Sequence, residues 1–169
     1  RRSPPQRTRA DLRPLIQRTC ELLEPLAEKQ QVRLAWDESV EPMWAAVDQG
    51  QLQQSLTNLI MNAIQAMPEG GDVRIALTAV VAAQPGRAAA ATRSWVRIRV
   101  VDTGPGIPAE IRDQVFEPFF TTKEIGEGTG LGLSIAYGMI QEHGGWIDVS
   151  SNTPHGTRFD VYLPAEEPA

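Results

Sequence analysis

Apolar residues recur at three- and four-residue intervals in several parts of the chain, and this spacing predicts amphipathic helices. The first helix starts at Asp11, and Pro25 is expected to bend or interrupt it because proline has no amide N–H. A second helix covers residues 48–67, and a third covers residues 131–143. A short helix is predicted over residues 108–116, with a proline near its first turn.

Alternating apolar and polar residues predict strands in the segments between these helices. The predicted strands cover residues 32–36, 43–47, 72–80, 95–102, 146–151 and 157–164. Strands that follow one another directly form antiparallel pairs, and the helices need a sheet face to cover. We therefore expect an α/β fold, a two-layer sandwich in which about three helices cover one face of a mixed, mostly antiparallel sheet.

Length and composition are those of a soluble, single-domain protein. The 169 residues suffice for one core, with residues 1–10 as a basic linker or tail and residues 11–169 as the domain. A net charge of −5 argues against nucleic-acid binding, and no apolar stretch approaches the length of a membrane span. The single cysteine, Cys20, fits a reducing compartment, so we expect a cytoplasmic location without membrane contact. The first residue is not methionine, and we expect a fragment of a longer protein, with or without a membrane anchor elsewhere.

The helix predicted over residues 48–67, with Asp48 as its N-cap, has an unusual polar side. Residues 49–68 include no charged residue. The polar positions nearly opposite the apolar face are Gln51, Ser55, Asn58, Asn62 and Gln65. Asn58 and Asn62 stand four residues apart, so their amides lie one turn apart on one face. Neutral oxygen ligands in this arrangement suit a hard cation such as Mg²⁺. The alternative is that the polar side of this helix packs on a neighbouring element through hydrogen bonds of its amides.

The sequence DTGPGIP, residues 102–108, follows an apolar strand and combines a carboxylate with two glycines. As a plain turn, it would use Asp102 as a cap and the glycines for positive φ angles. As a binding segment, it would use the carboxylate to accept a hydrogen bond from a ligand amine. The glycines would then let the backbone approach a flat ring.

The sequence TTKEIGEGTGLGL, residues 121–133, carries alternating glycines and runs into an apolar helix. Free backbone N–H groups at the positive end of a helix dipole form a phosphate cradle. The ammonium group of Lys123 would add a positive charge beside a phosphate. A loop with an incidental charge is the alternative, and the P-loop pattern is absent from this segment.

Five segments together resemble the GHKL, or Bergerat-fold, ATPases, and among them the catalytic and ATP-binding domain of sensor histidine kinases. DTGPGI resembles the first glycine box of this family, and the resemblance is closest to the nitrogen-regulation type of histidine kinase. The other segments are NLIMNAIQAMPEGG (58–71, N box), FEPFFTTK (116–123, F box), GEGTGLGLSIAYGMIQEHGG (126–145, second glycine box) and GTRFDVYLP (156–164, closing segment). The resemblance covers residues 11–164, with the motifs in the family's order.

The resemblance implies a role for each matching residue. Asn62 matches the asparagine that coordinates Mg²⁺, and Asn58 matches the N-box residue one turn earlier, which is expected to be catalytic. Asp102 matches the aspartate that recognises the adenine amino group, partly through water, and Thr157 matches the threonine behind the adenine. Lys123 is expected to meet the terminal phosphates and to take part in catalysis. The other residues expected to bind the nucleotide are Gly104, Gly106, Ile107, Phe119, Thr121, Thr122, Gly128, Thr129, Gly130, Leu131 and Gly132.

The implied activity is that of a kinase with ATP and Mg²⁺ as cofactors. The γ-phosphoryl group of ATP would pass to a histidine on an upstream dimerisation domain of the same protein, and then to the receiver domain of a response regulator. His143 and His155 are interpreted as structural, so this chain alone is expected to be monomeric and unable to label itself.

Two positions depart from patterns common in the family. Many members carry a basic residue at the place of Gln65, and hydrolysing relatives carry glutamate at the place of Asn58. The absence of that glutamate favours transfer over hydrolysis. The alternatives are another GHKL ATPase, a serine-directed kinase, or a nucleotide-binding module without kinase activity.

Overall fold

The computed structural model of the chain describes residues 3–38, 40–86, 92–117, 132–152 and 154–166. Its elements follow the predicted order, with one strand added at the start. In chain order they are β1 (Thr8–Asp11), α1 (Leu12–Lys29), β2 (Val32–Trp36), β3 (Trp44–Val47), α2 (Gln49–Gln65), β4 (Gly71–Ala82), β5 (Arg93–Asp102), the 3-10 helix η1 (Ala109–Gln114), α3 (Gly132–Glu142), β6 (Trp146–Ser151) and β7 (Thr157–Glu166).

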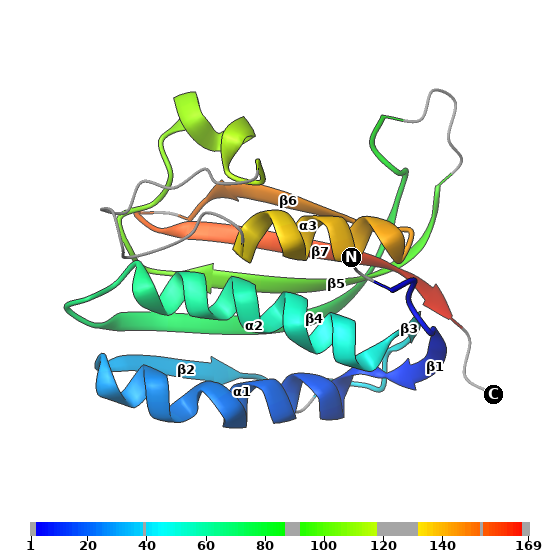
Figure 1. Cartoon of the computed structure of the whole chain (residues 1–169), viewed down its shortest axis with the longest axis horizontal. Helices are drawn as coiled ribbons and strands as arrows, with labels where there is room; N and C mark the ends of the chain where they lie inside the picture. Colours follow the sequence, from blue (N-terminus) through cyan, green and yellow to red (C-terminus); the bar gives the residue numbers. More distant parts are fainter. Residues whose placement is uncertain (1–2, 39, 87–91, 118–131, 153, 167–169) are drawn as a thin grey trace.

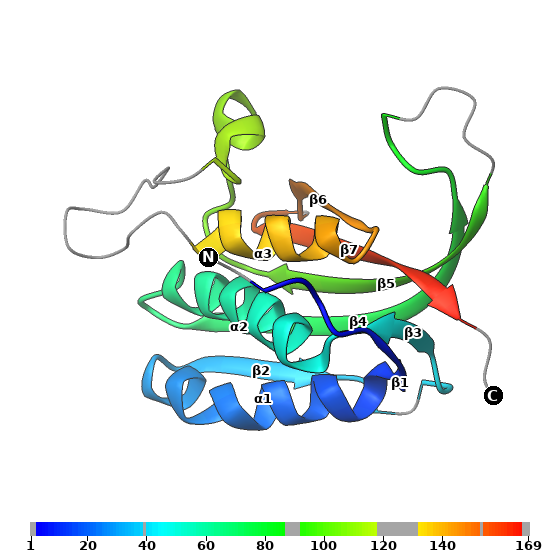
Figure 2. The same cartoon turned by 45° about the vertical axis from the view of Figure 1, so that its right-hand side comes forward.

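One mixed sheet of seven strands joins all of these strands in the order β1-β3-β7-β5-β4-β2, with β6 also paired to β7. Only β2 and β4 are parallel, and the other described strand pairs are antiparallel. The three long helices lie side by side along one face of the sheet (Figure 1). The view in Figure 2 shows the same two layers, with the β4–β5 hairpin extending beyond the helices at one end. The predicted two-layer sandwich with a mostly antiparallel sheet is therefore confirmed.

The core lies between the helices and every second residue of the central strands. From β4, β5 and β7 it takes Val73, Ile75, Leu77, Val96, Ile98, Val100, Phe159, Val161 and Leu163, all nearly or fully buried. The apolar side of α2 packs on this layer through Leu52, Leu56, Leu59, Ile60 and Ala63. Each fully buried aliphatic side chain contributes about 1.5–3 kcal/mol to folding. Because this face of α2 is fixed against the sheet, the direction of its remaining polar side chains is fixed as well.

Three local expectations were wrong. The helix α1 is not interrupted at Pro25 and continues to Lys29, since Leu23 and Ala27 on either side of the proline are buried and hold both turns in the core. Thr8–Asp11, expected mostly as linker, forms strand β1 because its backbone pairs with β3. The short helix after Pro108 is a 3-10 helix of six residues rather than a longer helix to residue 116.

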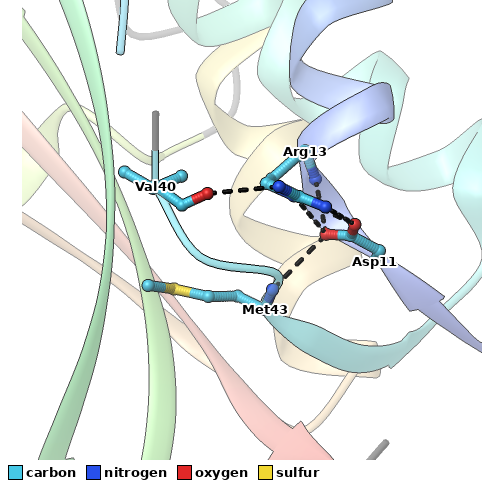
Figure 3. A network of polar contacts seen from close by, with 4 residues as sticks. All are labelled: Asp11, Arg13, Val40 and Met43. Atoms are coloured by element: carbon cyan, nitrogen blue, oxygen red, sulfur yellow. Dashed lines mark hydrogen bonds and ion pairs between the residues drawn. The ribbon is translucent and has the colours of Figure 1, made fainter. Parts of the chain in front are cut away.

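The junction between β1 and α1 is held by an ion pair that reaches the loop before β3 (Figure 3). The Asp11 carboxylate is the N-cap of α1 and accepts hydrogen bonds from the Arg13 backbone N–H (3.2 Å) and from the Met43 N–H (3.4 Å). The Arg13 guanidinium binds the same carboxylate through Nη2 (2.9 Å) and donates through Nη1 to the Val40 carbonyl oxygen (3.2 Å). Burial alone would raise the pKa of Asp11, but these hydrogen bonds outweigh it and hold the pKa below 3.8.

We expect Asp11→Ala to lower the free energy of unfolding by about 1 kcal/mol at pH 7, the usual cost of losing an N-cap. Because the folded pKa lies below the unfolded value of 3.8, this contribution is present above that pH and is lost as the pH falls through the folded pKa. Urea denaturation at pH 7 and at about pH 3 measures the difference. Asp113→Ala, which removes an exposed carboxylate outside the network, serves as the control. An equal loss at both pH values would contradict the assignment.

Candidate functional site

The two asparagines of α2 lie on the side of the helix that points away from the core. Asp48 caps this helix as predicted, accepting a hydrogen bond from the Gln51 N–H. Asn58 is half-buried and its Nδ2 donates to the Gly132 carbonyl oxygen (3.1 Å), which joins α2 to the first turn of α3. Asn62, one turn later and also half-buried, has no hydrogen bond to the residues that the structure describes. Its amide therefore remains available for a ligand.

Ser55 does not belong to this polar side, contrary to the expectation from spacing. Its side chain is fully buried between α2 and α3, and its Oγ lies 3.1 Å from the Gln51 carbonyl oxygen and 3.3 Å from Met139 Sδ. A buried serine on a helix can satisfy its hydroxyl with the carbonyl one turn earlier, so helix–helix packing tolerates it. The polar side of α2 at this point is therefore carried by Asn58 and Asn62 and not by Ser55.

Asp102 ends β5 and is 3% exposed. Its Oδ1 accepts hydrogen bonds from the Gly104 N–H (2.9 Å) and the Thr157 N–H (3.2 Å). Its Oδ2 forms no hydrogen bond within the described part of the chain. Burial raises the pKa of Asp102, and the two backbone donors partly offset this effect. The result is a rigidly oriented carboxylate with one oxygen able to accept a hydrogen bond from a ligand.

The glycines after Asp102 are required by packing inside the protein. A Cβ on Gly104 would lie 3.0 Å from Met67 Cγ and 3.2 Å from Asp102 Oδ1. Gly106 has a φ of +84°, and a Cβ there would lie 3.1 Å from the Gly156 carbonyl oxygen. The segment after β5 therefore packs directly on the end of α2 and on the turn before β7. This contact places the amides of α2 and the Asp102 carboxylate on adjoining elements.

The remaining site residues predicted from the sequence divide into two groups. Ile107 packs partly buried against the core, Thr157 is buried at the start of β7, and Gly132 is exposed at the start of α3. Phe116 stacks on Tyr137 of α3, with ring centroids 4.8 Å apart. The residues that lie outside the described part of the chain are Phe119, Thr121, Thr122, Lys123, Gly128, Thr129, Gly130 and Leu131.

Both ring nitrogens of His143 are used inside the fold. His143 is fully buried, its Nε2 accepts a hydrogen bond from the Asp48 N–H (3.0 Å), and its Nδ1 lies 2.7 Å from the Met139 carbonyl oxygen. The ring thus carries its proton on Nδ1 and connects the end of α3 to the start of α2. This geometry agrees with the structural interpretation of this histidine.

A family model described as histidine kinase-, DNA gyrase B-, and HSP90-like ATPase matches residues 47–167. The chain belongs to this ATPase family. The match contains α2, Asp102 and Thr157, so the site described above lies within the family's domain. The family predicted from the sequence motifs is confirmed.

Sensor histidine kinases are among the relatives of this member of the ATPase family. Sensor kinase CckA of Brucella abortus (strain 2308) is 45% identical over 120 residues, which cover 69% of this chain and 13% of that protein. Sensory histidine kinase/phosphatase NtrB of Klebsiella oxytoca is 44% identical over 118 residues, which cover 69% of this chain and 32% of that protein. The crystal structure of full-length ShkA in complex with AMPPNP has a TM-score of 0.79 at 29% identity, covering 97% of this chain and 32% of ShkA. The chain thus spans a third or less of the length of each of these proteins.

Two further findings limit the chemistry of the described residues. They contain no group of three or more histidine, cysteine, aspartate or glutamate side chains that could hold a metal ion. None of their helices is long and apolar enough to cross a membrane.

Proposed function

We propose that the chain is the ATP-binding catalytic domain of a two-component sensor histidine kinase. The observation that carries this proposal is the carboxylate of Asp102, which is buried, held by two backbone donors through Oδ1, and without a hydrogen bond at Oδ2 from any described residue. A carboxylate in this setting accepts a hydrogen bond from an amine and cannot donate one. Adenine presents an exocyclic amine, whereas guanine presents a carbonyl oxygen at the corresponding ring position. The proposed site therefore selects ATP.

The adenine would lie among residues of β5, β7 and the segment that follows β5. Asp102 would accept the hydrogen bond, and Thr157, buried beside it, would lie behind the ring. The absence of side chains at Gly104 and Gly106 keeps this segment close to α2. Ile107 would supply an apolar contact to the ring.

The residues present fit a magnesium ion bound together with the nucleotide. Asn62 offers a neutral amide oxygen that no described residue occupies, and Mg²⁺ takes few protein ligands because it retains waters and binds phosphate oxygens. We propose that Asn62 holds Mg²⁺, which would neutralise charge on the phosphates. Asn58 has its amide nitrogen fixed by the Gly132 carbonyl oxygen, so its Oδ1 has a defined orientation for catalysis.

The phosphates would be held mainly by the segment between Phe116 and α3. Lys123 is proposed to neutralise the terminal phosphates, and the backbone of the glycine-rich segment to surround them, as the resemblance implies. Phe119, Thr121, Thr122, Thr129 and Leu131 are proposed to contribute to the same nucleotide contacts. These roles are supported by the family match, which extends across the segment.

The phosphoryl acceptor is proposed to lie outside this chain. His143 is buried with both nitrogens in use, and the exposed His155 lies in the turn between β6 and β7. We propose that the γ-phosphoryl group passes to a histidine on an upstream dimerisation domain and then to a response regulator receiver domain. Residues before β1 would connect to the upstream domain, and the chain alone would be a monomer in the cytoplasm.

Incubation of this chain with labelled ATP, Mg²⁺ and the separately produced upstream domain tests the proposal. Acid-labile phosphohistidine on the upstream domain is the expected product, and omission of Mg²⁺ should abolish it. Label on serine, or hydrolysis of ATP by this chain alone, would contradict the kinase assignment while leaving nucleotide binding intact.

A further inference from the structure

The turn between β6 and β7 contacts the segment after β5 at several successive points. Nδ2 of Asn152 donates to the backbone carbonyl oxygen of Asp102 (3.3 Å). The Thr157 N–H, directly after the turn, donates to Oδ1 of the Asp102 side chain (3.2 Å). Nδ1 of His155 lies 3.3 Å from the Gly104 carbonyl oxygen. Both the backbone and the carboxylate of Asp102 are therefore fixed from this turn.

The two backbones are also in direct contact. Gly156 has a φ of +115°, and a Cβ on it would overlap the carbonyl oxygen of Asp102. A Cβ on Gly106 would lie 3.1 Å from the Gly156 carbonyl oxygen. A side chain would overlap the neighbouring backbone at Gly156 and would be crowded at Gly106, so a displacement of the turn would displace the segment that carries Asp102.

Asn152 connects the turn and the segment through a single amide group. Its backbone N–H donates to the Gly156 carbonyl oxygen (3.1 Å), which closes the turn. Its Nδ2 lies 3.3 Å from the His155 carbonyl oxygen and 3.3 Å from the Asp102 carbonyl oxygen. A side-chain amide nitrogen carries two hydrogens, so it can donate to both carbonyls at once.

We propose that Asn152 is a positioning residue that sets the place of the Asp102 carboxylate and thereby the selectivity of the site for adenine. This inference rests on the proposed function, since it assigns to Asp102 the recognition of the base. Asn152 acts through the backbone and has no need to touch the nucleotide. Loss of its amide donors would remove this hydrogen bond from the Asp102 carbonyl and allow the carboxylate to shift relative to the base.

Asn152→Ala and Asn152→Asp test this inference by titration of the chain with ATP and with GTP. We expect each change to raise the Kd for ATP about tenfold, the effect of one lost hydrogen bond, and to lower the ratio of GTP to ATP dissociation constants. The aspartate keeps the size of asparagine but cannot donate a hydrogen bond when ionised. Asn152→Asp therefore tests the loss of the hydrogen bonds without the loss of side-chain volume that Asn152→Ala also causes.

Ser150→Ala is the matched control within the same hairpin. Its hydroxyl accepts a hydrogen bond from Arg158 Nε (2.9 Å), so the change also removes one polar contact of β6 with β7. It should leave the Kd for ATP and the GTP-to-ATP ratio unchanged. Thermal unfolding of each variant shows whether the fold is retained.

The outcomes separate this inference from the proposed function. If the wild-type chain binds ATP selectively and both Asn152 variants keep its Kd and its ratio, the inference is overturned and the function stands. If the variants lose affinity for ATP and GTP equally and unfold at lower temperature, Asn152 is only structural and the inference is again overturned. If the wild-type chain does not bind ATP, the proposed function fails first and the inference fails with it.

Discussion

Replacing Asp102 with asparagine is expected to weaken ATP binding roughly 10- to 100-fold, because a charge-assisted hydrogen bond of about 1.5–3 kcal/mol is lost. The amide oxygen of asparagine can still accept the hydrogen bonds from Gly104 and Thr157. Its NH₂ group would then occupy the place of Oδ2 and face the amine of the adenine. Two donors would oppose each other across the contact.

The same substitution should not lower the stability of the protein without nucleotide. Burial raises the pKa of Asp102 above its value of 3.8, so the ionised side chain is less favourable in the folded state than in the unfolded state. As the pH rises from 3.8 through the folded pKa, the wild-type protein loses stability, and the asparagine variant does not. The variant should therefore gain in relative stability as the pH rises from 3.8 through the folded pKa of Asp102, and keep that gain at higher pH.

Isothermal titration with ATP and urea denaturation at several pH values measure the two effects. Asp148→Asn, which neutralises an exposed carboxylate on β6, is the matched control and should change neither quantity appreciably. Unchanged ATP affinity in Asp102→Asn would reject the assignment of Asp102 to the base. A large loss of stability at pH 7 would instead assign the carboxylate a structural role.

Replacing Asn62 with alanine is expected to lower Mg²⁺-dependent phosphotransfer to the upstream domain by about 100-fold, comparable to the loss of one preorganised electrostatic contact. The stability of the chain should be retained or increased, because alanine is a better helix former than asparagine and the Asn62 amide has no described hydrogen bond to lose. The structure thus supports a functional interpretation of an unfavourable residue in the helix.

Phosphotransfer at several Mg²⁺ concentrations and ATP binding without Mg²⁺ distinguish a metal ligand from a packing residue. Binding of ATP in the absence of Mg²⁺ should be little changed by Asn62→Ala. Gln54→Ala removes an exposed amide from the same helix and should leave the rate of transfer intact. If phosphotransfer by the Asn62→Ala variant depends on the Mg²⁺ concentration as it does in the wild-type chain, Asn62 is excluded as the ligand of Mg²⁺.

The elements that the sequence predicts well are those whose signals are local. The helix predicted over residues 48–67 is Gln49–Gln65 in the structure, with Asp48 as its cap. Both the capping carboxylate and the apolar repeat act within a few residues of the positions they determine. The strand before Asp102 was predicted for the same reason, since alternation along β5 follows the two faces of the sheet.

The predictions that were wrong depended on distant partners. Strand β1 forms because β3 is available beside it, and Pro25 stays within α1 because residues on both sides of it are buried. Ser55 has the polarity and spacing of an exposed residue, but α3 covers it. Periodicity describes one element at a time and contains no information on which neighbour covers a given position.

The sequence by itself determined the family, the order of its motifs, the carboxylate at the end of a strand and the uncharged amides along one helix. The tertiary structure alone decided that Asn152 and Gly156, about 50 residues after Asp102 in the chain, lie against the backbone carbonyl of that residue. A hydrogen bond between such distant residues requires its donor and acceptor atoms to lie about 3 Å apart, and only the packing of the whole sheet brings them together.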